Sequence, residues 1–158
     1  MDQVLVNFLG GARRAFGKEF NDPSLGPDDG KWVELAKMPG FWLNLEWMPD
    51  AKKIWERIKD KNTYILSACP SPELNPLCAP EKIQWCIREL GIAPERIITV
   101  FKRSEKYQVK YTRNGGRPNN LLIDDHFDTC MNWTLRDGTA IWHHTVPETL
   151  NELDQFTF

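Results

Sequence analysis

The sequence predicts an α/β protein with a mainly parallel sheet flanked by helices. Apolar runs rich in β-branched residues recur along the chain, and most are separated by stretches with helical spacing, which is the pattern of βαβ units. The runs are almost continuously apolar, as expected of strands that are buried on both faces. The expected strands are residues 4–6, 63–66, 97–100 and 121–123, with a weaker one at 140–142.

Helices are expected between these strands because apolar residues recur there at intervals of three and four. In residues 80–90, Ile83, Ile87 and Leu90 share one stripe, and Gly91 follows where a left-handed residue ends a helix. In the last helix, Pro147 lies in the first turn, where proline is tolerated. The expected helices are residues 31–38, 51–59, 80–90, 127–135 and 147–153.

Residues 18–50 interrupt this alternation with turn-forming and aromatic residues. The segment is too short and too rich in turns to fold alone, so it is expected to cover one end of the sheet as a small cap. Residues 1–158 therefore form a single domain that contains this insertion. A chain of 158 residues and 18.4 kDa is long enough for one substantial core.

The composition indicates a soluble globular protein. The formal charge is −2 and the pI is about 5.9, with basic residues scattered along the chain, which argues against long nucleic acids as partners. No apolar run is long enough to span a membrane, and the first residues lack the pattern of a signal peptide, so we expect a cytoplasmic protein. The four cysteines show no CxxC pair and are expected to be free thiols.

Two adjacent carboxylates, Asp124 and Asp125, follow the expected strand at 121–123. Ligands bind at the carboxyl edge of parallel sheets. Neighbouring carboxylates repel each other, and a cation such as Mg²⁺ would relieve that repulsion, so the pair is a candidate metal site. The alternative is that these residues only start the next helix, where aspartate is favoured.

A second strand end adds Ser67 and the backbone N–H of Ala68 to the same edge, where they could hold phosphate oxygens. A cation is needed opposite a phosphate, and Lys106 follows the next strand. Lys110 is a rival for this role, since it too precedes the strand that ends at Asp124. The order of a serine, a lysine and two aspartates after successive strands carries this prediction.

That order resembles the haloacid dehalogenase superfamily, and within it the 5′(3′)-deoxyribonucleotidase-like branch of bacteria and phages. The resemblance covers nearly the whole chain. Its other parts are Glu81-Lys82-x-x-Trp85 with Leu90-Gly91-Ile92, then Trp133 and Gly138 after the acidic pair, and Val4-Leu5-Val6-Asn7-Phe8 at the front. It implies a Rossmann-like fold with a small cap, and Mg²⁺ bound by Asp124 and Asp125.

The resemblance also implies a catalytic pair of aspartates in the first motif. Asp2 matches the second of them, which works as acid and base beside Ser67 and Lys106, while the nucleophile would precede Met1. We therefore expect either that the chain as given begins too late or that the protein has kept the fold without the chemistry. Asn7, in the other alignment of the first motif, could not replace a carboxylate nucleophile.

Phe41, Trp42 and Trp47 lie in the expected cap and could stack on a nucleobase or pack the cap onto the core. The implied function is Mg²⁺-dependent hydrolysis of (deoxy)nucleoside monophosphates or other small phosphoesters. The alternative is an inactive relative that binds a nucleotide or a protein partner. A homodimer is a further expectation, because a shortened central strand leaves backbone groups free to pair with another chain.

Overall fold

The computed structural model describes the backbone of residues 1–113 and 120–156 and the side chains of residues 1–109 and 120–156. Seven α-helices lie in this part of the chain, joined by short 3₁₀ turns at Pro23–Leu25, Pro94–Arg96 and Arg103–Glu105. The helices are α1 (Phe8–Phe16), α2 (Asp28–Ala36), α3 (Ala51–Ile58), α4 (Cys78–Leu90), α5 (Lys106–Arg113), α6 (Phe127–Thr134) and α7 (Val146–Gln155).

The strands form two short parallel pairs. Strand β1 (Ile65–Ala68) pairs with β2 (Ile97–Val100), and β3 (Leu121–Asp124) pairs with β4 (Thr139–Trp142). Parallel pairing joined through helices confirms the predicted α/β class. Each pair is a separate two-stranded sheet within the described residues, in place of the one continuous sheet that was expected.

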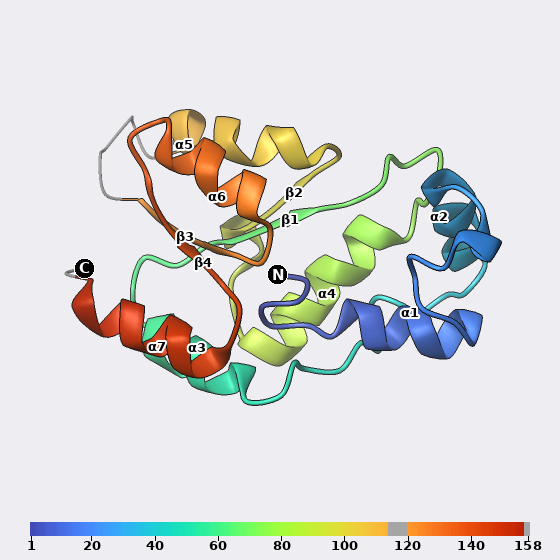
Figure 1. Cartoon of the computed structure of the whole chain (residues 1–158), viewed down its shortest axis with the longest axis horizontal. Coiled ribbons are helices and arrows are strands. Elements are labelled where there is room, and N and C mark those ends of the chain that lie inside the picture. Colours follow the sequence, from blue (N-terminus) through green and yellow to red (C-terminus); the bar gives the residue numbers. More distant parts are fainter. Residues whose placement is uncertain (114–119, 157–158) are drawn as a thin grey trace.

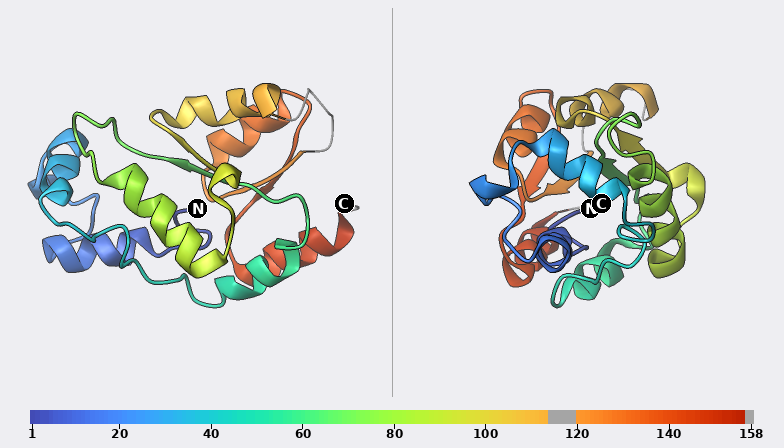
Figure 2. Two further views of the ribbon diagram at one scale, coloured as in Figure 1. Left: turned by 180° about the vertical axis from the view of Figure 1, so that it is seen from behind. Right: turned by 90° about the vertical axis from the view of Figure 1, so that its right-hand side faces the viewer.

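Helices cover both sides of the strands. Helices α5 and α6 lie on one side, and α3 and α7 lie together on the other (Figure 1), an arrangement that the view from behind also shows (Figure 2). Helices α1 and α2 lie beyond one end of the strands, and α2 belongs to the segment expected to be a cap. In the described residues, no helix has the length and apolar character needed to cross a bilayer.

The predicted strand at residues 4–6 is wrong. The backbone N–H groups of Val4, Leu5 and Val6 all point to the Met1 carbonyl, at 3.3, 2.9 and 3.3 Å, and so form a turn. Gln3 has a φ of 55°, which a strand does not allow. All three apolar side chains are buried nonetheless. A run of only three apolar residues marks burial, and in this case burial does not require a strand.

Residues 18–50 contain the first 3₁₀ turn, helix α2 and the turns up to Asp50, and they pack against α1 through aromatic rings. Phe8 on α1 is central, because the ring of Trp42 stacks on it with centroids 5.2 Å apart and planes 4° apart. Phe20, Trp32 and Phe41 also lie within 6.3 Å of the Phe8 ring. Stacked and edge-on aromatic pairs add to the stability that burial gives.

The buried face of helix α4 is unusual because it carries charged side chains as well as apolar ones. Its buried side chains recur at helical spacing, and two of them, Glu81 and Lys82, are charged. The helix ends where the sequence predicts, since Gly91 adopts a left-handed φ of 63° and donates its N–H to the Ile87 carbonyl. The buried members of the stripe are Cys78, Glu81, Lys82, Trp85, Cys86 and Leu90.

The apolar interior forms two clusters. The larger one gathers α1, α4 and the turns of residues 1–6 and 40–48, while the smaller one is built from Ile54, Ile141 and Leu153 on α3, β4 and α7. Ile58 and Ile123 pack against both clusters and so connect them. All four cysteines are free, as expected, and the structure shows that all four are buried.

Candidate functional site

A buried ammonium group, Lys82 Nζ, is the centre of the polar interior. It donates to Asp2 Oδ2 at 2.6 Å, to the Ala68 carbonyl at 2.9 Å and to Ser67 Oγ at 3.2 Å. These three contacts use all the hydrogen-bond donors that a lysine has. The lysine side chain is only 2% exposed, so the carboxylate of Asp2 compensates a charge that water cannot reach.

A second buried ion pair lies at the end of β3. Lys106 Nζ, at the start of α5, donates to Asp124 Oδ2 at 2.7 Å, and the backbone N–H of His126 donates to Asp124 Oδ1 at 3.0 Å. Both side chains are under 10% exposed, at 9% and 3%. The structure therefore places Lys106, expected to face a phosphate, in direct contact with the acidic strand end.

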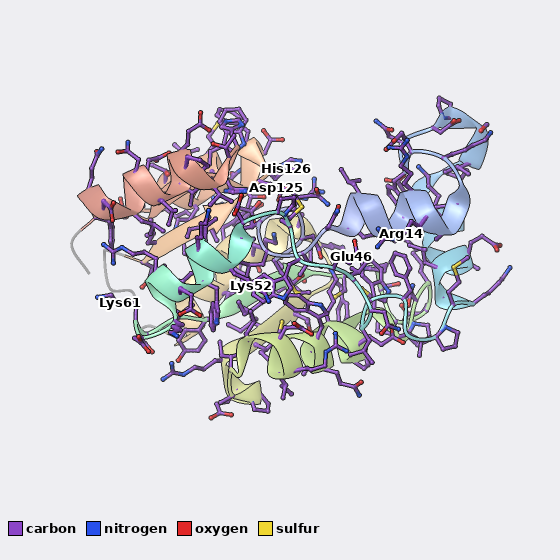
Figure 3. The ribbon with its side chains drawn as sticks, turned by 90° about the horizontal axis from the view of Figure 1, so that it is seen from below. Arg14, Glu46, Lys52, Lys61, Asp125 and His126 are labelled. Atoms are coloured by element: carbon purple, nitrogen blue, oxygen red, sulfur yellow. The ribbon has the colours of Figure 1, made fainter. Side chains whose placement is uncertain are left out.

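Asp125 differs from its neighbour because it is exposed at the strand end. Its carboxylate is nevertheless partly shielded from solvent, and this shielding together with the nearby charge of Asp124 raises the pKa of Asp125. Figure 3 shows Asp125 beside His126, whose ring nitrogen Nε2 lies 2.6 Å from a guanidinium nitrogen of Arg103. The two aspartates thus have different surroundings, because Asp124 is buried against Lys106 whereas Asp125 reaches the surface.

The two ion pairs belong to one region. Asp2 interacts electrostatically with both Lys82 and Lys106, and Lys106 also acts on Asp125. The amino group of Met1 is buried among Asp2, Asp124 and Asp125, where burial and Lys106 lower its pKa. The structure therefore brings Asp2, Ser67, Ala68, Lys106, Asp124 and Asp125 to one edge of the strands. The rival Lys110 has a side chain outside the described residues.

The pKa of Asp2 gives the site a pH dependence. Burial raises this pKa, but the Lys82 ammonium outweighs burial, and the pKa is lower than usual. A carboxylate with a lowered pKa stabilises the fold fully above its unfolded pKa of about 4, and this contribution is lost as the pH falls through the folded value. We expect the difference in unfolding free energy between the wild type and Asp2→Asn to shrink below about pH 4. Urea titrations from pH 7 to pH 2 measure it, and a constant difference would contradict the assignment.

The three aromatic residues expected to stack on a base have different surroundings. Trp42 is 2% exposed, with Phe8 stacked on it and Lys82 Nζ 4.7 Å from its ring centroid. Trp47 donates Nε1–H to Glu89 at 2.9 Å and packs against Trp85. Phe41 is half-buried and borders a shallow hollow of about 360 Å³ beside Arg14 and Asn44. Trp42 and Trp47 therefore serve the packing of residues 18–50 in this structure.

The sequence pattern did not predict Glu81 and Lys82 as site residues. Both were noted only as part of the motif Glu81-Lys82-x-x-Trp85. In the structure Glu81 accepts hydrogen bonds from the backbone N–H groups of Gly40 at 2.7 Å and Trp42 at 3.0 Å. A usable signal was present, since both charges occupy the stripe that also carries Cys78, Trp85 and Cys86. A charged residue inside an apolar helical stripe indicates a buried partner.

Carboxylate oxygens of Asp124 and Asp125 are donors of the type that Mg²⁺ prefers. However, both oxygens of Asp124 are already engaged by Lys106 and by the His126 N–H. Among the side chains that the structure describes, no three His, Cys, Asp or Glu residues gather around one point that could hold a metal ion. The described arrangement does not by itself form a magnesium centre, and the expected Mg²⁺ dependence stays a prediction.

Comparison with known proteins supports the family resemblance. The chain is 27% identical over 166 aligned residues to the human cytosolic type of 5′(3′)-deoxyribonucleotidase, an alignment that covers 92% of this chain and 76% of that protein. No protein-family model matches the chain. No solved structure matches it either. The similarity supports a nucleotidase-like protein.

Proposed function

We propose that this protein binds a nucleoside monophosphate through its phosphate at the edge that carries Ser67, Lys82 and Lys106. The observation that carries the proposal is the convergence of two buried ammonium groups and a serine hydroxyl on one polar region. Buried lysines with fixed partners are costly to maintain for stability alone. The nucleotide class comes from the similarity to the human deoxyribonucleotidase.

The phosphate would compete for cations that carboxylates now hold. Lys106 is bound to Asp124, and Lys82 is bound to Asp2. A phosphate oxygen is also a strong acceptor for an ammonium and for the Ser67 hydroxyl. The backbone N–H of Ala68, at the end of β1, is the further donor in this proposal. Residues 18–50 act as the cap, since Trp42 closes over the Lys82 ammonium.

Calorimetric titration of the 158-residue chain with deoxynucleoside monophosphates and with inorganic phosphate tests the proposal. Lys106→Ala removes a charge-assisted hydrogen bond and is expected to weaken binding at least about tenfold. Lys102→Ala is the matched control, since this lysine is exposed four residues earlier. The proposal fails if the wild type binds neither ligand at millimolar concentration, or if the two variants bind alike.

Hydrolysis of the bound ester is a second candidate, favoured by one atom of Asp2. Its Oδ1 is buried with no hydrogen-bond partner, so this oxygen can take a proton. In the proposed reaction water attacks phosphorus, the bond between phosphorus and the ester oxygen breaks, and Asp2 accepts the water proton and passes it to the leaving oxygen. Inorganic phosphate and a nucleoside are the products.

Phosphate release from deoxynucleoside monophosphates, with and without Mg²⁺, tests hydrolysis separately. We expect release by the wild type and its loss in Asp2→Asn, which retains the shape of the side chain. Binding without release in either condition would contradict hydrolysis and leave a nucleotide-binding protein without turnover. Release that persists in Asp2→Asn would remove Asp2 from the reaction.

A further inference from the structure

Three aromatic side chains gather on the surface at the carboxyl ends of β3 and β4. Phe127 is 50% exposed and Trp142 is 42% exposed, and their ring centroids are 4.9 Å apart. The exposed His144 also contacts the indole, with centroids 3.9 Å apart. We call Phe127, Trp142 and His144 the rim cluster.

The rim cluster is fixed to the acidic strand end. Trp142 lies directly beside Asp124 in the register of the two parallel strands. Its indole Nε1–H donates to the Asp125 carbonyl at 3.0 Å, and the next residue, His143, donates its backbone N–H to the Asp124 carbonyl at 2.9 Å. The indole is therefore held in one orientation next to the residues that neighbour the proposed phosphate position.

The exposure of this indole contrasts with that of the cap aromatics. Trp42 is 2% exposed and stacked between protein groups, whereas Trp142 leaves two fifths of its surface to solvent. A rigid, exposed aromatic that is bonded at its polar tip is suited to stacking on another flat ring. Such stacking strengthens binding of a base in a way that depends little on which base it is.

We propose that the rim cluster binds the heteroaromatic base of the nucleoside monophosphate whose phosphate lies at the Lys106 edge. This inference rests on the proposed function and adds the place of the base to it. Continuity with the phosphate region favours a ring of the same ligand, because Trp142 is bonded to Asp125 and lies in register with Asp124. The competing occupant is a second copy of the chain. It would also cover Met131 of α6 and Leu135 just after this helix, both of which are exposed.

The test compares ligands that share a phosphate but differ in the base. Deoxyadenosine monophosphate, ribose 5-phosphate and inorganic phosphate are titrated by calorimetry into the wild type and into Trp142→Leu. We expect Trp142→Leu to weaken binding of the deoxynucleotide about tenfold and to leave ribose 5-phosphate unchanged. Trp142→Phe keeps a ring and is expected to retain most of the affinity.

Tyr64→Leu is the matched control, because Tyr64 is 37% exposed and lies at the opposite, amino end of β1. Circular dichroism of each variant establishes that it is folded before titration. If no phosphate ligand binds the wild type, the proposed function itself fails.

Two outcomes would contradict base binding by the rim cluster and leave the proposed phosphate binding intact. In the first, the wild type binds deoxyadenosine monophosphate no more tightly than ribose 5-phosphate. The other is a Trp142→Leu variant that loses deoxynucleotide and ribose 5-phosphate affinity equally. A dimer that Trp142→Leu converts to a monomer by light scattering, with affinity for the base unchanged, would identify the second copy as the occupant.

Discussion

Replacing Lys82 by alanine is expected to lower the free energy of unfolding by about 3 kcal/mol, because a partly buried carboxylate loses its compensating charge. Ser67 Oγ and the Ala68 carbonyl lose a donor in the same variant. Removal of one partner of a buried pair costs about 3–5 kcal/mol, and the lower end applies because the Asp2 side chain is 27% exposed. Urea unfolding monitored by circular dichroism measures the change.

Lys31→Ala is the matched control for this prediction. The side chain of Lys31 is also buried, at 6% exposed, but its ion-pair partner Asp28 is 70% exposed. Water can replace the lysine there, so we expect a loss of about 1 kcal/mol. Equal losses in the two variants would show that packing of the aliphatic stem, and not the charge, determines the stability. Lys82→Met, which keeps the stem, separates the same two contributions.

Glu81→Ala is expected to cost about 3 kcal/mol, since two backbone N–H groups lose a charged acceptor. These donors belong to Gly40 and Trp42, and their positions hold residues 40–42 against α4. The loss should extend to the position of Trp42 over Lys82, so near-ultraviolet circular dichroism should weaken with stability. Chemical unfolding gives the magnitude.

Glu89→Ala provides the comparison on the same helix. Glu89 also accepts a hydrogen bond from the 40–48 turns, through Trp47 Nε1, but its side chain is 28% exposed. Water can satisfy the indole N–H in its absence, and we expect a loss of about 1 kcal/mol. A loss for Glu81→Ala no larger than that for Glu89→Ala would contradict the assigned role of Glu81.

The sequence pattern was most informative for the four strands, each of which overlaps a predicted apolar run. The strand at 97–100 was predicted with its observed bounds, and β3 and β4 differ from prediction by one residue. Strand β1 starts two residues later than predicted, at Ile65, because the chain enters it through a turn near Thr63. The failure at residues 4–6 arose because their N–H groups bond to the Met1 carbonyl in a turn, which an apolar run of three residues does not distinguish from a strand.

The candidate site was predictable where polar residues end a strand. Ser67 and Asp124 end strands, Lys106 follows the next strand, and their order along the chain carried the prediction. In the structure Lys106 donates to Asp124 and Ser67 accepts from Lys82. Lys82 and Glu81 were harder, because lysine and glutamate on a helix are usually solvated and their partners lie far away in the chain. Glu81 bonds residues about forty positions earlier, and Lys82 bonds Asp2 eighty positions earlier. Such distances carry no local signal.

The division of the interior into two clusters affects how the protein opens. Among the described residues, only Ile58 and Ile123 pack against both clusters, and α4 belongs to the larger cluster whereas α7 and β4 belong to the smaller one. Sub-global unfolding of a unit with few outside contacts requires less free energy than global unfolding. Amide hydrogens of α7 should therefore exchange with deuterium sooner than those in the middle of α4. In such an opening the C-terminal helix detaches, and the Lys82 ion pair on α4 stays intact.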